Sequence, residues 1–167
     1  METKIVLLSD AEEKRRVSRT ILEALPDWFG VAESREEYIQ ASAGQPTFAA
    51  FRDGQPVGFL CLKETGRATV ELAVMGVLAS CHRQGTGKAL FAAAKDYAAR
   101  KGYCFMQVKT VKMGMYPDYD RTNLFYQSLG FQEFECFPLL WDEKNPCQIY
   151  VMNIAKSSED GKVIVQP

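Results

Sequence analysis

A chain of 167 residues that is 47% hydrophobic and 25% charged has the composition of one folded domain with a single core, which excludes a disordered chain. The net charge of -1 and the pI of about 5.9 offer no basic surface for nucleic acid. Five scattered cysteines without a C-x-x-C pair predict free thiols in a reducing, cytoplasmic compartment, and no segment is long and apolar enough for a signal peptide or a membrane span.

The first part of the chain predicts a strand and two helices. A strand is expected over Lys4–Leu8. A helix should follow from an N-cap at Ser9 or Asp10 to about Leu25, because apolar residues recur there at helical spacing. A second helix is predicted over residues 33–43, before a turn that contains glycine and proline.

Three consecutive strands should then form an antiparallel meander. The first two cover residues 47–52 and 56–63, and they are joined at Asp53-Gly54, a pair typical of two-residue hairpin turns. A turn near residues 65–66 leads to the third strand, whose apolar run over residues 72–79 suits a buried strand.

The second half of the chain alternates helices and strands. An Ala-rich helix over residues 88–100 leads to a strand over 103–111, which the helical crossover should make parallel to the central strand. The other predicted elements are a helix after a loop at 113–118, a strand at 131–137, an excursion at 141–146, a strand at 148–154, and a polar tail at 156–167 with room for a short strand at 162–165. This order predicts an α+β fold with a mixed sheet, in one domain over residues 1–155.

An apolar run, a polar break and an Ala-rich helix follow one another around two glycines, Gly85 and Gly87. Glycine lets the backbone turn and approach a ligand, and the unpaired N–H groups at the start of the helix favour an anion there. A Walker A loop is excluded, because it would need other residues in place of His82 and Ala89. A dinucleotide fingerprint is excluded, because it would need a small residue in place of Leu90.

Two blocks of the sequence carry motifs that one known family combines. The first block is His82-Arg83-Gln84-Gly85-Thr86-Gly87. The second runs from Tyr119 to Phe131 and contains Tyr126, a glycine C-cap and a phenylalanine that opens a strand. In this order and at this distance they resemble motifs A and B of the GNAT superfamily, the acyl-CoA-dependent N-acetyltransferases. His82 stands where the family usually has Gln or Arg, and Tyr119 replaces the usual Asn, with Asn123 one helical turn later on the same face.

The resemblance implies a GNAT-like α+β fold with a mixed, mostly antiparallel sheet of about seven strands and about four flanking helices. It also implies an N-acetyltransferase that moves an acetyl group from acetyl-CoA to a primary amine of a small molecule or peptide by direct transfer. No metal is expected, because His82 is the only histidine and has no second ligand nearby. The alternative is a non-catalytic acyl-CoA-binding sensor module, which the departures at His82 and Tyr119 keep open. Exposed sheet edges also allow a homodimer, as in many relatives.

The resemblance places the donor along the central strand and the following helix. Main-chain N–H groups of residues 83–88 would hold the pyrophosphate, and the strand edge at residues 75–77 would pair with the pantetheine arm. Arg83 and Lys88 could balance phosphate charge or lie solvated at the surface. The candidate cofactor contacts are Met75, Gly76, Val77, His82, Arg83, Gln84, Gly85, Thr86, Gly87, Lys88, Tyr119 and Asn123.

Two residues are candidates for the proton transfers. The family's motif B helix places a Tyr beside the CoA sulfur, so Tyr126 is the candidate general acid, with a core tyrosine as the alternative. Glu71 opens the central strand, where a Glu takes the amine proton in some relatives, and is the candidate general base. Its alternative role is a solvated strand end paired with Arg67 or Lys63. Cys81 lacks a well-oriented base, so no covalent enzyme intermediate is expected.

Three aromatic loops are candidates for acceptor binding. They combine aromatic area with carboxylates, a composition that suits a cationic amine. In the family the connection between the first two helices borders the acceptor site. The candidates are Trp28, Tyr116 and Trp141, and the alternative is that these rings cap the core at the surface.

Overall fold

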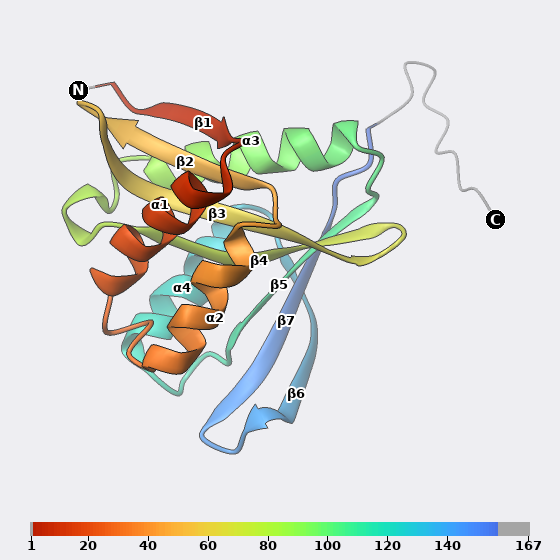
Figure 1. The fold of residues 1–167 in the computed structure, drawn as a ribbon. Coiled ribbons are helices and arrows are strands. Elements are labelled where there is room, and N and C mark those ends of the chain that lie inside the picture. Colours follow the sequence, from red (N-terminus) through yellow and green to blue (C-terminus); the bar gives the residue numbers. More distant parts are fainter. Residues whose placement is uncertain (1, 157–167) are drawn as a thin grey trace.

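The computed structural model describes residues 2–156 and shows a seven-stranded sheet in the order β1-β2-β3-β4-β5-β7-β6 (Figure 1). Neighbouring strands are antiparallel except β4 and β5, which are parallel. The strands are β1 (Lys4–Leu8), β2 (Thr47–Arg52), β3 (Gln55–Gly66), β4 (Thr69–Val77), β5 (Phe105–Val111), β6 (Gln132–Asp142) and β7 (Asn145–Asn153). The predicted fold class, a mixed and mostly antiparallel sheet with four helices, is confirmed.

Four α-helices and one short 3-10 turn connect the strands. The Asp10 carboxylate accepts the Glu13 N–H at 2.8 Å and so caps the first helix, as the sequence predicts. Pro117 opens the last helix, where its missing N–H leaves no hydrogen bond unmade. The helices are α1 (Ala11–Glu23), α2 (Ala32–Ser42), α3 (Thr86–Arg100) and α4 (Pro117–Ser128), with η1 (Ala79–Cys81) between β4 and α3.

The sheet separates two hydrophobic cores. On one face α1 and α2 pack on the first four strands through a cluster that includes Ile21, Ile39 and Phe59. On the other face α3 and α4 cover a larger cluster that includes Leu90 and Tyr150. Burial of apolar surface on both faces fixes the positions of α3 and α4 relative to the middle of the sheet.

The strands β4 and β5 pair over only three residues and then separate. Their register joins Thr69 to Phe105, Val70 to Met106, and Glu71 to Gln107. Beyond Glu71, β4 continues along β3 while β5 continues along β7. The rest of β4 therefore presents an unpaired main-chain edge, and the gap between the two strands opens toward α3 and α4.

Several predicted boundaries need correction. The turn expected near residues 65–66 lies at 67–68, because β3 extends to Gly66. The α3 helix begins at Thr86, two residues earlier than expected, and the central strand ends at Val77 rather than at residue 79. The excursion expected at 141–146 is a tight turn between two long strands, so Trp141 belongs to β6. The possible strand at 162–165 lies outside the described residues.

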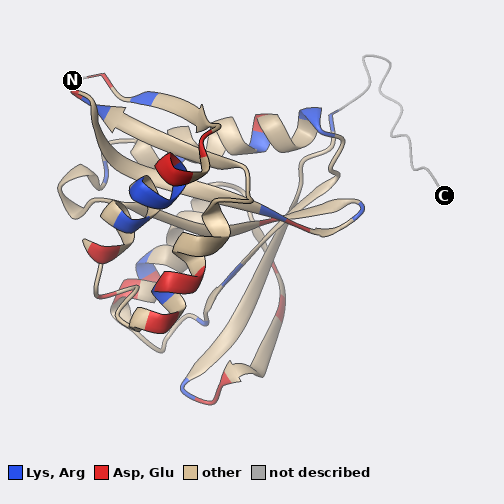
Figure 2. Cartoon of the chain, viewed as in Figure 1, with Lys and Arg blue, Asp and Glu red and all other residues tan. Residues whose placement is uncertain are grey.

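Charges of both signs are interspersed along α1 and α2 (Figure 2). Arg19 of α1 donates to both carboxylate oxygens of Glu36 on α2, at 2.8 Å each. This exposed pair links the two helices at the surface. Among residues 2–156, no helix combines the length and apolar composition that a membrane crossing requires.

Candidate active site

A cleft of about 1230 Å³ opens where β4 and β5 separate. Its floor is the unpaired part of β4 and the facing part of β5, and its walls are the start of α3 and most of the length of α4. The connection between α1 and α2 and the tip of the β6–β7 hairpin complete the rim. Most of the residues that the two motifs predict thus face one space, whereas Gln84 and Asn123 do not line it.

The loop before α3 offers a row of free hydrogen-bond donors. The main-chain N–H groups of residues 83–88 donate no hydrogen bond to the part of the chain that the structure describes. Arg83, Gly85, Thr86, Gly87 and Lys88 all line the cleft. A pyrophosphate supplies acceptor oxygens and negative charge for such N–H groups at a helix start. The residues present therefore fit the phosphate-bearing part of an acyl-CoA.

The two glycines of the loop are needed for different reasons. Gly85 has φ of 82°, a left-handed conformation that favours glycine. A Cβ on Gly87 would lie 3.0 Å from Cζ of Phe125 on α4, so the missing side chain lets α3 and α4 approach closely. Of the pair that the sequence singles out, one glycine shapes the loop and the other permits helix packing.

The predicted strand edge at Met75 to Val77 lines the cleft. Met75 and Val77 are partly buried. A Cβ on Gly76 would lie 2.9 Å from Cγ2 of Ile21 on α1, so this glycine is required by packing on the other face of the sheet. The main chain of these residues remains available on the side facing away from β3.

His82 lies at the end of this edge. Its Nε2 atom is 2.7 Å from the Val77 carbonyl oxygen, and its ring meets the edge of Trp28 at a centroid distance of 6.0 Å. His82 thus links β4, the loop before α3 and the connection between α1 and α2.

Tyr126 lines the cleft from α4 and is only 6% exposed. Its ring packs against Phe125, Phe131 and Tyr150, so it contributes to the core while it lines the cleft. Its hydroxyl makes no hydrogen bond to the described residues. Burial, followed by the nearby hydroxyls of Tyr38 and Tyr119, raises its pKa above the usual value for a phenol. The group therefore stays protonated at neutral pH and can donate to a leaving thiolate.

Glu71 lies at the point where β4 and β5 separate. Its side chain is buried, and both carboxylate oxygens lie 3.3 Å from Nζ of Lys109 on β5. The expected alternative partners Arg67 and Lys63 are not its ion-pair partners. Both Glu71 and Lys109 line the cleft.

The motif B positions Tyr119 and Asn123 are used differently. Tyr119 lines the cleft, and its hydroxyl donates to the Trp28 carbonyl oxygen at 3.1 Å. Asn123 is fully buried: its amide nitrogen donates to the carbonyl oxygens of Val111 and Tyr119, and its side-chain oxygen accepts the Tyr150 hydroxyl at 2.7 Å. The fold does not bring Asn123 to the cleft, so its side chain holds α4 to the sheet instead of facing a donor.

The acceptor candidates are only partly brought together. Trp28 and Trp141 line the cleft, whereas Tyr116 does not. The Tyr116 hydroxyl donates to the Lys144 carbonyl oxygen at 3.0 Å and thereby ties the β6–β7 turn to the start of α4. Tyr116 therefore supports the hairpin that carries Trp141.

The sequence patterns did not predict four residues of this region. Lys109 pairs with Glu71, Arg35 and Tyr38 line the cleft from α2, and Arg52 holds the loop before α3 from behind. Each is far in sequence from the residues it serves, so no local pattern pointed to it. The one available signal was the alternation of β5, which places Lys109 two residues from the register partner of Glu71.

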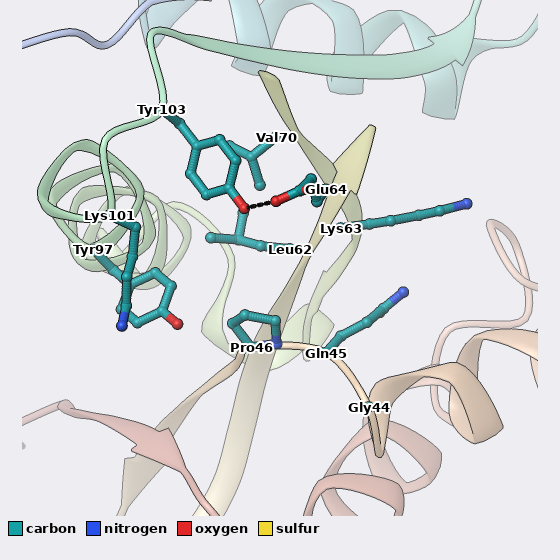
Figure 3. A pocket seen from close by; sticks show the side chains of 10 residues that line it. All are labelled: Gly44, Gln45, Pro46, Leu62, Lys63, Glu64, Val70, Tyr97, Lys101 and Tyr103. Atoms are coloured by element: carbon teal, nitrogen blue, oxygen red, sulfur yellow. Dashed lines mark hydrogen bonds between the residues drawn. The ribbon is translucent and has the colours of Figure 1, made fainter. Parts of the chain in front are cut away.

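A second hollow, of about 460 Å³, lies beside the C-terminal end of α3 (Figure 3). Tyr103 donates a hydrogen bond to Glu64 across it, and Lys101 lies over the Tyr97 ring at 5.4 Å. None of the residues that the motifs predict lines this hollow. The large cleft is therefore the candidate active site. Within the described residues no group of three or more His, Cys, Asp or Glu side chains could hold a metal ion.

Comparison with known proteins gives a family match that spans this cleft. Residues 43–133 match the model of the acetyltransferase (GNAT) domain. No curated protein sequence matches the chain. Since the matched segment covers more than half of the chain, the protein belongs to the GNAT acetyltransferase family, and its class is that of acyl-CoA-dependent acetyltransferases.

Solved structures with low sequence identity share the fold. An aminoglycoside 6'-N-acetyltransferase complexed with coenzyme A has a TM-score of 0.75 and 15% identity, covering 93% of this chain and 99% of that one. Ard1 from Thermoplasma volcanium has a TM-score of 0.73 and 13% identity, over 93% and 100% of the two chains. The ribosomal-protein-S18-alanine N-acetyltransferase from Escherichia coli has a TM-score of 0.72 and 17% identity, over 95% and 98%.

Proposed function

We propose that this chain transfers the acetyl group of acetyl-CoA to a primary amine of a small molecule or peptide. The observation that carries the proposal is the convergence of three features on one cleft: free N–H groups at the start of α3, the Tyr126 phenol, and the Glu71 carboxylate. The N–H groups would bind the phosphates of a CoA thioester. Tyr126 would protonate the leaving thiolate, and Glu71 would accept the proton of the amine.

The donor would lie along the unpaired edge of β4. Its pyrophosphate would accept hydrogen bonds from the N–H groups of residues 83–88, and Arg83 and Lys88 would add positive charge. Main-chain groups of residues 75–77 would pair with the amides of the pantetheine arm. The exposed β4 edge, created by the separation from β5, supports this arrangement.

Transfer would proceed directly between the two substrates. The amine nitrogen attacks the thioester carbonyl carbon while Glu71 accepts the amine proton, directly or through water. The C–S bond then breaks, and Tyr126 donates its proton to the departing thiolate. Cys81 is buried beside Arg52, and the Nε2 atom of the neighbouring His82 lies on the Val77 carbonyl oxygen, which argues against an acyl-enzyme on this thiol.

The acceptor would enter between the aromatic side chains at the rim. Trp28, Trp141 and Tyr38 line the cleft, and burial, followed by the nearby charge of Glu71, raises the pKa of the Tyr38 phenol. Aromatic faces and a buried carboxylate suit the binding of a primary amine beside Glu71, the group that would accept its proton during attack. The five free cysteines support a cytoplasmic setting, and the exposed side chains of the edge strand β6 support a homodimer.

The proposal is tested by thermal unfolding and by thiol release. Acetyl-CoA should raise the unfolding temperature, because it binds only the folded chain. Release of free CoA should then depend on an added amine. No stabilisation at millimolar acetyl-CoA overturns the proposal. Stabilisation without thiol release across a broad amine panel supports the alternative, a non-catalytic acyl-CoA sensor.

A further inference from the structure

Arg52, at the end of β2, links two separate segments of the chain, the N-terminus and the loop before α3. Its Nε donates to the Thr3 hydroxyl at 2.8 Å, its Nη1 to the Gln84 side-chain oxygen at 2.5 Å, and its Nη2 to the Thr86 hydroxyl at 3.0 Å. Nη1 also lies 3.6 Å from the Cys81 sulfur. Three of these four contacts lie in or next to the loop that precedes α3.

This loop has little to hold it from within. Its main-chain N–H groups make no bonds to the described chain, and α3 has no side-chain N-cap. Arg83 has φ of 58°, an uncommon conformation for a residue with a side chain. Such a conformation persists only when the surrounding structure determines it. The Arg52 side chain supplies that external support through Gln84 and Thr86.

The support comes from behind the cleft. Arg83, Gly85 and Thr86 line the cleft, while Arg52 and Gln84 do not. Thr86 is 2% exposed, so its hydroxyl is held against Arg52 inside the protein. Its main-chain N–H is one of those that make no hydrogen bond to the described residues. Gln84 connects Arg52 to η1 as well, because its amide nitrogen donates to the Ser80 carbonyl oxygen at 2.8 Å.

We propose that Arg52 is a positioning residue for the donor's pyrophosphate. It holds Gln84 and Thr86 so that the N–H groups of residues 83–88 point into the cleft, and its guanidinium adds positive charge behind them without touching the donor. The proposal rests on the proposed use of acetyl-CoA. It predicts that Arg52 acts on the phosphate-bearing part of the donor and leaves the chemistry at the thioester unchanged.

The test compares two donors in the Arg52→Ala variant. Acetyl-CoA carries the pyrophosphate, whereas S-acetylpantetheine lacks it. Arg52→Ala should raise the Kd and KM for acetyl-CoA roughly tenfold, the scale of lost hydrogen bonds from a charged donor, with little change in kcat. The kcat/KM for S-acetylpantetheine should stay unchanged. Equal losses with both donors, or none with acetyl-CoA, overturn the proposal.

Two further variants separate positioning from general destabilisation. Thr86→Val removes one acceptor of Arg52 with little change of shape, so its effect on the Kd for acetyl-CoA should be much smaller in the Arg52→Ala background than alone. Arg100→Ala removes an exposed arginine at the far end of α3 and should leave the Kd unchanged. If the effects of Arg52→Ala and Thr86→Val on the Kd for acetyl-CoA are additive, the proposal is contradicted. If the wild-type chain itself fails to bind acetyl-CoA, the proposed function fails instead.

Discussion

The Nε2 atom of His82 lies 2.7 Å from the carbonyl oxygen of Val77. The Leu78 N–H donates to Val57 on β3, and a trans peptide points its N–H and its C=O to opposite sides, so the Val77 carbonyl faces the unpaired edge of β4. His82 therefore occupies a main-chain acceptor at the end of the edge assigned to the pantetheine arm. His82, which stands where the family usually has Gln or Arg, therefore links β4 to the loop before α3.

Replacement of His82 should weaken donor binding through this link. His82→Phe keeps an aromatic ring beside Trp28 but removes the donor to Val77, and the KM for acetyl-CoA should rise about fivefold, the scale of one net hydrogen bond. His82→Gln retains a side-chain donor and should lose less. Steady-state kinetics at saturating acceptor measures both values. Equal KM values for the phenylalanine variant and the wild type would show that the hydrogen bond has no part in donor binding.

Removal of the Tyr126 hydroxyl should slow the chemistry without loosening the fold. The hydroxyl has no partner among the described residues, so Tyr126→Phe leaves no orphaned group and keeps the ring contacts. We expect kcat to fall about 100-fold, at the low end for general acid catalysis, while the Kd for acetyl-CoA and the unfolding temperature stay constant. Unchanged turnover would remove Tyr126 from the mechanism. Phe131→Leu, which alters the neighbouring packing, serves as a control for indirect effects.

The Glu71 carboxylate should matter more than its ion pair with Lys109. Glu71→Gln removes the proposed base and should lower kcat/KM and change its dependence on pH. Lys109→Met removes the partner but retains the carboxylate, so it should lose some stability and keep substantial activity. The two pH–rate profiles, measured beside that of the wild type, provide the comparison. If both variants lose activity equally with unaltered profiles, Glu71 acts through the ion pair alone.

The buried Cys61 thiol should make the fold sensitive to alkali. Burial raises its pKa to about 12, from an ordinary value of 9.0. Above pH 9 the unfolded chain releases this proton while the folded chain retains it, so the free energy of unfolding falls as pH rises toward 12. The loss between pH 8 and 10 should be smaller in Cys61→Ala than in the wild type, by on the order of 1 kcal/mol. Urea unfolding at the two pH values measures this difference, and equal losses would contradict the assignment.

Local patterns in the sequence predicted the main elements of the fold. The Asp53-Gly54 turn, the cap at Asp10 and the left-handed Gly85 depend on residues within a few positions, whose conformational preferences act over that range. The family was indicated by the resemblance of residues 82–87 and 119–131 to motifs A and B, in the expected order and at the expected distance. The α+β order and the parallel pairing of β4 with β5 are confirmed.

The sequence alone determined the Asp53-Gly54 turn, the cap at Asp10, and which family combines the two motifs. Only the tertiary structure decided which side chains meet: Lys109 with Glu71, Arg52 with Thr86, and Asn123 with Tyr150 in the core. These partners lie 27 to 38 positions apart in the chain. Contacts over such separations depend on strand order and on how helices pack against the sheet, and no local preference encodes them.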